Sequence, residues 1–153
     1  MNIIFVINSD DLMLATPHPA PFSHENWIFE LKYDGFRCLV RKVGSRVELL
    51  SRNGKPLNRS FPDVVAAIER LPGSFVWDAE LTVDEPTGRS SFGRLQLRAR
   101  MSMAMRVRDA AKLHPARLYI FDLLAAGDQD LRELPLTQER EQVEVVHAVA
   151  GHE

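Results

Sequence analysis

The chain has 153 residues, of which 45% are hydrophobic and 26% are charged, and its formal net charge is −2 at pH 7. This composition is typical of one globular domain. It excludes a disordered chain, a collagen-like chain and, with Cys38 as the one cysteine, a disulfide scaffold. Two blocks, residues 31–60 and 91–118, are net basic between acidic segments, which predicts either ordinary solvated charge or two patches that face a polyanion.

The N-terminal segment lacks the pattern of a leader or a membrane anchor. Residues 3–7 are apolar, but no basic residue precedes them, and Asp10 and Asp11 follow. No apolar run in the chain approaches the ~20 residues that span a bilayer. We therefore expect a cytoplasmic chain without membrane contact. Residues 12–24 contain three prolines and predict an extended lead-in.

A two-residue alternation over residues 27–33 predicts a strand with one buried face. Its apolar side is Trp27, Phe29, Leu31 and Tyr33, and its polar side is Glu30, Lys32 and Asp34. The dipeptide at 34–35 predicts a turn. Gly44-Ser45 predicts the tight link of a hairpin between strands 36–43 and 46–51.

Helices and strands alternate in the second half of the chain. Ser60 has the chemistry of an N-cap for a helix over residues 61–71. Residues 75–83 alternate as a second one-sided strand, and residues 85–88 predict a turn. Residues 91–112 predict helix in pieces, residues 118–124 an apolar strand, and Thr137 the start of a last helix. Together these elements predict an α+β fold with mainly antiparallel sheets and flanking helices.

One short string of residues has a specific chemistry. Residues 32–37 form a K-x-D-G-x-R pattern, Lys-Tyr-Asp-Gly-Phe-Arg, which chance rarely produces in a chain of this length. A deprotonated, well-aimed lysine amine attacks phosphorus. A glycine lets backbone approach a ligand, and an arginine donates paired hydrogen bonds to phosphate. The alternative is a surface ladder of ion pairs on one strand face.

With this string the chain resembles ATP-dependent DNA ligases, which are covalent nucleotidyltransferases like RNA ligases and mRNA-capping enzymes. Residues 30–37 resemble the nucleotide-binding motif of that family. Further similar segments follow in the family's order: residues 13–17, 51–54, 78–81 (with Ala79 in place of the usual glycine), 91–96, 119–124 and 134–140. The members that it resembles are the bacterial ligases of non-homologous end joining.

The resemblance implies a nucleotide site. Lys32 would attack the α-phosphate of ATP, forming lysyl-AMP and releasing pyrophosphate. Glu30 would contact the adenine amino group, Phe121 would stack on the adenine, and Leu31 would belong to the same nucleotide-binding set. Without the family, an aromatic residue such as Phe121 in an apolar strand is more often part of a core.

The resemblance also implies phosphate and metal contacts. Arg37 and Arg52 would contact the AMP and the 5′-phosphate of a DNA nick, and Glu80 would bind a ribose hydroxyl or a divalent metal. The implied cofactors are ATP and Mg²⁺ (or Mn²⁺), and the implied partner is nicked or broken double-stranded DNA, held mostly through its phosphates. Without the family, Arg52 is a turn residue and Glu80 a solvent-facing carboxylate.

The sequence departs from the family near its end. The family's later "E-G" segment and "K-x-K" strand, whose lysines hold the α-phosphate, are not found. The first eleven residues do not resemble the family either, and we expect residues 1–11 to be an atypical N-terminal extension. Residues 12–140 would be an incomplete ATP-grasp-like nucleotidyltransferase domain, and residues 141–153 the tail of the last helix. Missing strands would expose sheet edges and apolar surface.

The expected function is that of an ATP-dependent DNA ligase in repair or recombination, in the bacterial cytoplasm at the nucleoid. Because two phosphate-binding lysines are not found, we expect this chain alone to be slow or inactive. The alternatives are a non-catalytic nucleotide- or DNA-binding remnant and half of a split ligase whose partner chain carries the missing motifs. A further alternative is an RNA ligase or capping-type enzyme.

Overall fold

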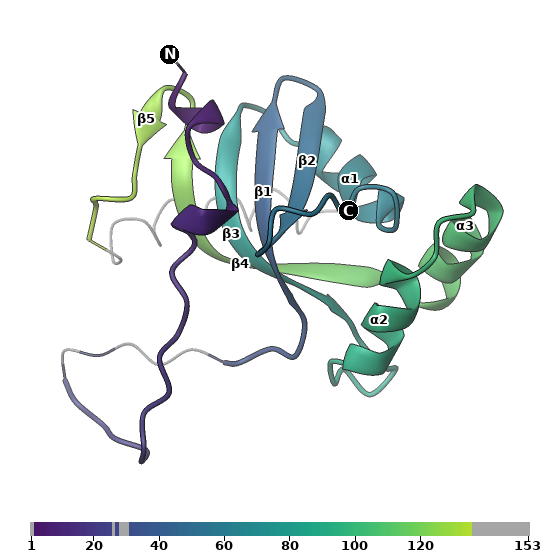
Figure 1. Cartoon of the computed structure of the whole chain (residues 1–153), viewed down its shortest axis with the longest axis horizontal. Helices are drawn as coiled ribbons and strands as arrows, with labels where there is room; N and C mark the ends of the chain where they lie inside the picture. The colour runs from purple at the N-terminus through teal and green to yellow at the C-terminus, as the bar shows by residue number, and fades with distance from the viewer. Residues whose placement is uncertain (1, 26, 28–30, 136–153) are drawn as a thin grey trace.

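An antiparallel five-stranded sheet with three helices forms the centre of the structure (Figure 1). The computed structural model describes residues 2–25, 27 and 31–135. The strands, in the spatial order β2-β1-β3-β4-β5, are β1 (Phe36–Val43), β2 (Arg46–Ser51), β3 (Phe75–Val83), β4 (Ala116–Ala126) and β5 (Gln129–Asp130). The helices are α1 (Pro62–Glu69), α2 (Phe92–Ala99) and α3 (Ala104–Leu113), and the 3-10 turns η1 (Ile3–Phe5) and η2 (Ser9–Asp11) lie at the N-terminal end. The predicted α+β class is confirmed.

The main core lies on one face of the sheet, which we call the first face. Alternate residues of β3 point into it, as the two-residue period of residues 75–83 predicted, and Trp77, Ala79 and Leu81 are almost fully buried there. Helix α1 covers this face with its apolar stripe, which includes Ile68, and α2 adds Leu95. No helix within the described residues is long and apolar enough to cross a membrane.

Local turn chemistry fixes the order of the strands. Gly44 has a φ of 58°, which suits the two-residue link between Val43 and Arg46 in the β1–β2 hairpin. Gly127 has a φ of 56° and likewise turns the chain from β4 into the two-residue strand β5, which the sequence did not predict. Irregularities in the β3–β4 register lie between Val76 and Trp77 and between Asp78 and Ala79.

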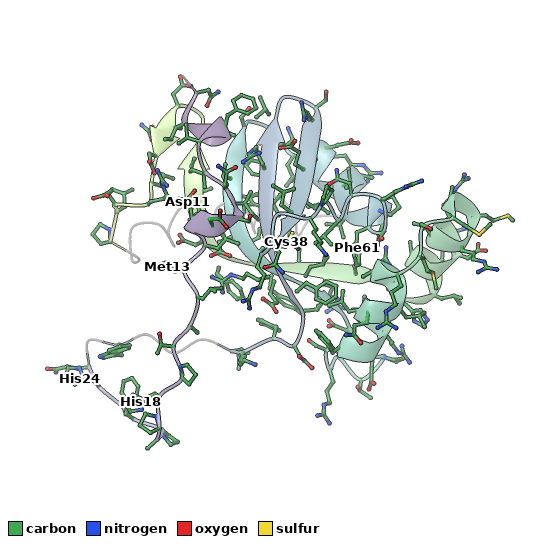
Figure 2. The ribbon with its side chains drawn as sticks, viewed as in Figure 1. Asp11, Met13, His18, His24, Cys38 and Phe61 are labelled. Atoms are coloured by element: carbon green, nitrogen blue, oxygen red, sulfur yellow. The ribbon has the colours of Figure 1, made fainter. Side chains whose placement is uncertain are left out.

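The opposite, second face of the sheet is covered at one end by the N-terminal segment. Ile4 and Ile7 are fully buried there against Leu39, Val76 and Leu124. Figure 1 shows this segment crossing the sheet on the side away from α1, and Figure 2 marks Asp11 and Met13 where it leaves the sheet. The N-terminal segment therefore shields the apolar residues at this end of the second face from solvent.

Three sequence predictions are wrong. The strand at residues 75–83 was predicted to be buried on one face, but Val76, Asp78 and Thr82 on its other face are buried as well, Val76 because the N-terminal segment covers it. The described residues of the predicted strand 27–33 are not in a strand, and Trp27 and Leu31 are 60% and 76% exposed, because the described residues offer no neighbouring strand to pair with them. Ser60 does not cap α1, whose N-cap is Phe61. The Ser60 hydroxyl instead donates to carbonyl oxygens at the end of α2. The predicted helix from Thr137 lies outside the described residues.

Candidate functional site

Polar and charged side chains gather on the second face, near the point where β1 begins. The register of the sheet pairs Arg37 with Glu80 across β1 and β3, and pairs Glu80 with Tyr119 and Asp78 with Asp122 across β3 and β4. Because residues opposite one another in a sheet project to the same side, these five residues form one cluster on three adjacent strands.

Arg37 is the centre of this cluster. Its guanidinium donates from Nε to Asp78 Oδ1 at 2.5 Å, from Nη2 to Asp78 Oδ2 at 2.6 Å, and from Nη2 to the carbonyl oxygen of Met13 at 2.8 Å. It also lies over the ring of Phe121, 5.3 Å from the ring centre, within the range of a cation–π contact. The hydrogen bonds from Arg37 to Asp78 raise the pKa of the guanidinium.

Three of the five N–H donors of the guanidinium are engaged in this way. The two donors on Nη1 have no acceptor among the described residues, and the side chain is 23% exposed. Arg37 is therefore fixed in orientation and still open toward solvent, which is the arrangement that binding of a phosphate or ribose oxygen requires.

The carboxylates beside Arg37 are shielded from water. Burial raises the pKa of Asp78, despite the hydrogen bonds from Arg37, and the nearby charge of Asp122 raises it further. Asp122 Oδ1 is buried and accepts no hydrogen bond within the part of the chain that the structure describes. Buried acceptors of this kind usually have a partner, so Asp122 Oδ1 is an acceptor whose hydrogen-bonding capacity is not used within the described residues.

Glu80 connects this cluster to the K-x-D-G-x-R string. Its Oε1 accepts a hydrogen bond of 3.2 Å from the backbone N–H of Gly35. Burial raises the pKa of Glu80, while the charges of Arg37 and of Lys32 act in the opposite direction. Lys32 is exposed to solvent and near enough for its charge to act on Glu80. The structure thus places Lys32, Arg37 and Glu80 at the same end of the second face.

Gly35 is required by close packing at this point. A Cβ on this residue would lie 2.3 Å from the carbonyl oxygen of Leu81 and 2.9 Å from Thr82 Cγ2. The chain therefore passes directly against β3 before β1 begins, which carries the backbone of residues 32–35 to Glu80.

Tyr119 of the cluster stacks on a second tyrosine, and the sequence did not predict this pair. The rings of Tyr33 and Tyr119 are 3.7 Å apart and nearly parallel, and Tyr119 donates from its hydroxyl to Asp84 at 3.2 Å. The alternation in residues 27–33 placed Tyr33 on an apolar face and so contained part of the signal. Its partner lies 86 positions along the chain, and nothing in the sequence pairs the two.

The remaining predicted site residues that the structure describes, Arg52 and Leu31, make no hydrogen bond or ion pair with the cluster within the described part of the chain. Arg52 is exposed in the turn after β2, and the pairing of Ser51 with Cys38 places that turn at the end of the sheet where β1 begins. Leu31 is exposed. Glu30 lies outside the described residues.

The predicted basic patches are wrong for three of their members. Arg41, Lys42 and Arg98 are 9%, 3% and 1% exposed. Lys42 donates to the carbonyl oxygens of Gly44 and Gly73, and Arg98 forms an ion pair with Asp63. These cations satisfy acceptors within the protein, so they are not available to an external polyanion.

The side chains at the cluster suit a nucleotide and a divalent metal. Lys32 and Arg37 offer cationic donors for phosphates, and Asp122 Oδ1 is an acceptor without a partner among the described residues. No group of three His, Cys, Asp or Glu side chains that could hold a metal by itself is found in the described part of the chain. Mg²⁺ is usually held by one or two carboxylates together with substrate phosphates, and Glu80 fits that role.

Comparison with known proteins gives a consistent result. The family model described as "ATP dependent DNA ligase domain" matches residues 13–151. The chain is 40% identical over 124 residues to DNA ligase C2 of Mycolicibacterium smegmatis and 41% identical over 124 residues to DNA ligase C of Mycobacterium tuberculosis, and each match covers 80% of this chain. This chain spans about a third (34%) of the length of both relatives.

The fold is also similar to solved structures. A mycobacterial DNA ligase D complexed with ATP and MES matches with a TM-score of 0.64 and 27% sequence identity, over 78% of this chain and 36% of that chain. The ligase domain of M. tuberculosis LigD matches with a TM-score of 0.63 over 78% of this chain. The sheet and helices described above are thus similar to part of these domains.

Proposed function

The chain belongs to the family of ATP-dependent DNA ligases, and from this premise we propose that the cluster around Arg37 is its nucleotide site, with Lys32 as the nucleophile. The observation that carries the proposal is the grouping of an exposed lysine amine, a half-buried carboxylate and an anchored arginine, Lys32, Glu80 and Arg37, at one end of the second face.

The first step of the proposed reaction is self-adenylation. Lys32 Nζ attacks the α-phosphorus of ATP, a P–N bond forms, the P–O bond to pyrophosphate breaks, and the amine proton goes to solvent. Arg37 would hold a phosphate or ribose oxygen through its free Nη1 donors. Glu80 would help to hold Mg²⁺, which neutralises charge on the leaving pyrophosphate.

The adenine would be held at the edge of the same cluster. Phe121 presents an aromatic ring beside Arg37, and base–aromatic stacking suits any purine. Glu30 and Leu31 adjoin Lys32 in the sequence, and we propose that they complete the nucleotide-binding set. Arg52, in the exposed turn at the same end of the sheet, would contact AMP or a DNA 5′-phosphate.

The later steps are proposed for the chain together with segments that its longer relatives contain, in the same polypeptide or in a partner chain. AMP would pass from Lys32 to the 5′-phosphate of a DNA nick, and the 3′-hydroxyl would then displace AMP to seal the break. The partner would be nicked or broken double-stranded DNA, bound mainly through phosphates. The proposal places this reaction in the bacterial cytoplasm, at the nucleoid.

A labelling assay tests the first step. The chain is incubated with α-³²P-ATP and Mg²⁺ or Mn²⁺ and run on a denaturing gel beside Lys32→Ala and, as a matched control, Lys55→Ala, which removes another exposed lysine of the same basic block. We expect acid-labile label in the parent and in Lys55→Ala and none in Lys32→Ala. Label that persists in Lys32→Ala would refute the assignment of the nucleophile.

A second interpretation, in which the chain is half of a split ligase, has one observation in its favour. The described residues of the 27–33 segment leave Trp27 and Leu31 exposed despite their alternating pattern, as expected if another segment covers them in the active enzyme. A chain that binds ATP, forms no label alone and gains label with a separately expressed remainder of a ligase domain would be half of a split ligase. Binding without label in either case would indicate a non-catalytic nucleotide-binding remnant.

A further inference from the structure

The N-terminal segment packs against the sheet, and all of it up to Leu12 precedes the family match. The match begins at residue 13, whereas the structure places residues 4, 7 and 12 in the interior. Ile4 and Ile7 are 0% exposed and Leu12 is 6% exposed, while Phe5 and Val6 between them are 53% and 42% exposed. This spacing of buried positions shows that the segment is anchored by specific side chains.

The segment also has a defined local shape. The Asn2 side chain accepts a hydrogen bond of 3.1 Å from the N–H of Ile4 at the start of η1. At the start of η2, the N–H of Asn8 donates to Asp11 Oδ2 at 2.7 Å. Such side-chain caps satisfy backbone groups that a short turn leaves unpaired. The segment therefore reaches the sheet as two ordered turns.

Residues that flank the two turns contact two arginines of β1 through two backbone oxygens and one side-chain oxygen. Arg41 donates from Nη2 to the carbonyl oxygen of Ile7 and, at 3.3 Å, to Asn8 Oδ1. Arg37 lies four residues before Arg41 on the same face of β1. It donates to the carbonyl oxygen of Met13 at 2.8 Å. Residues 2–13 therefore lie along the second face from the apolar end to the nucleotide cluster.

The contact with Met13 completes the enclosure of Arg37. Asp78 holds the guanidinium from β3, the Phe121 ring lies beneath it, and the Met13 carbonyl fixes Nη2 from the N-terminal side. The paired bonds to Asp78 fix the plane of the guanidinium. The Met13 carbonyl oxygen adds a third acceptor from another segment, and such supporting contacts hold a binding residue in its productive geometry.

We propose that residues 2–13, which we call the N-terminal clamp, are a working part of the nucleotide site: they fix the Arg37 guanidinium so that its free N–H groups meet a nucleotide phosphate. This inference rests on the proposed function for its consequence in catalysis. The hold on Arg37 itself does not depend on ATP and can be measured without it.

The test compares buried with exposed positions of the clamp. The double variant Ile4→Asp/Ile7→Asp removes both anchors from the second face, and the matched control Phe5→Asp/Val6→Asp adds the same charges at exposed positions of the same turn. The milder pair Ile4→Ala/Ile7→Ala is measured in parallel, because it removes the same anchors without placing a charge in the interior.

The readout is hydrogen exchange of arginine guanidinium Nη2–H groups by ¹⁵N NMR without ATP, because Nη2 of Arg37 is the atom that donates to the Met13 carbonyl oxygen. Arg98, bound to Asp63 on the first face, is the internal reference. We expect exchange at Arg37 to be ~10-fold faster or more in the anchor variants, and unchanged at Arg98 and in the control. Equally faster hydrogen exchange at Arg37 and Arg98 in the alanine pair would show a general loss of structure. Unchanged hydrogen exchange at Arg37 would show that the clamp does not fix its guanidinium. Either result would overturn the proposal.

A second arm measures self-adenylation with α-³²P-ATP. We expect the rate to fall ~10²-fold in the anchor variants at saturating ATP, since one lost preorganised donor typically has this effect, and to be unchanged in the control. Release of Arg37 without a slower rate would overturn the clamp's part in the site. A parent chain that is never labelled, with Arg37 held by the clamp as expected, would instead refute the proposed function.

Discussion

Replacement of Arg98 by methionine would distinguish a structural arginine from one that binds a polyanion. The Arg98 side chain is fully buried and donates to both carboxylate oxygens of Asp63, at 2.6 and 3.0 Å. It also donates to the carbonyl oxygens of Ser60 and His114, at 2.9 and 3.1 Å, and its guanidinium lies 4.6 Å from the centre of the Phe61 ring. One side chain thus connects α1, α2 and the end of α3.

The expected cost follows from these contacts. Removal of one partner of a buried ion pair costs about 3–5 kcal/mol, because the other charge is left without compensation. The Asp63 side chain is 30% exposed, so water would partly solvate the remaining carboxylate. We therefore expect Arg98→Met to lower the free energy of unfolding by about 3 kcal/mol, at the lower end of that range.

The loss should depend on pH with a definite sign. Burial alone would raise the pKa of Asp63, but the hydrogen bonds and charge of Arg98 hold it below its ordinary value of 3.8. The stability that this pair contributes is fully present above pH 3.8 and is lost as the pH falls through the lower folded-state pKa. The difference between parent and Arg98→Met should therefore shrink in acid.

Urea unfolding followed by tryptophan fluorescence at several pH values measures both effects. The control is Arg100→Met, which removes an exposed arginine two residues along. In DNA binding, Arg98→Met should leave the salt dependence of the folded chain unchanged, because a buried cation releases no counterion. A stability loss below about 1 kcal/mol at pH 7, the size of an exposed pair, or a flatter salt slope, would refute the reasoning.

Three further predictions concern the site. Gly35→Ala should destabilise the chain by about 1–3 kcal/mol in urea, because its Cβ would meet the Leu81 carbonyl oxygen; unchanged stability would contradict that packing. Burial raises the pKa of Glu80, so its ionisation opposes folding as the pH rises from the ordinary value of 4.5 through the raised one. Relative to the parent, Glu80→Gln should therefore gain more free energy of unfolding at pH 7 than at pH 4, and it should be slower in self-adenylation. An equal difference in free energy of unfolding at both pH values would contradict the raised pKa of Glu80. Phe121→Ala should raise the KM for ATP about tenfold or more with kcat little changed, since a stacked base is worth ~1–3 kcal/mol; an unchanged KM would remove Phe121 from the site.

The sequence predicted those elements whose neighbours lie close in the chain. The β1–β2 hairpin follows from Gly44-Ser45. The first face of β3 follows from its alternation, but the burial of its second face does not, because part of the cover there is the distant N-terminal segment. The predicted strand at 27–33 had the same alternation and failed for its described residues. A two-residue alternation indicates which side chains avoid water, but it does not indicate which other segment covers them.

The candidate site was predictable to the extent that side-chain chemistry defines it. The motif residues Lys32, Arg37 and Glu80 were identified from sequence and lie together. The Met13 carbonyl that fixes Arg37 was not identified, since every residue has a carbonyl and none is marked in a sequence. The partner of Tyr33 was missed for a related reason, because stacking with Tyr119 depends on a register that only the folded sheet sets.

Charge blocks were the weakest guide, and the structure explains why. In the block 31–60, Arg41 and Lys42 are buried, while Lys32 and Arg52 are exposed at the end of the sheet where the nucleotide cluster lies. An internal acceptor decides whether a cation is available: Arg41 binds the Ile7 carbonyl, far from it in sequence, and so is withdrawn from the surface. Under the proposed function, the exposed cations Lys32 and Arg52 would meet a nucleotide or a DNA end, whereas the basic block as a whole would not.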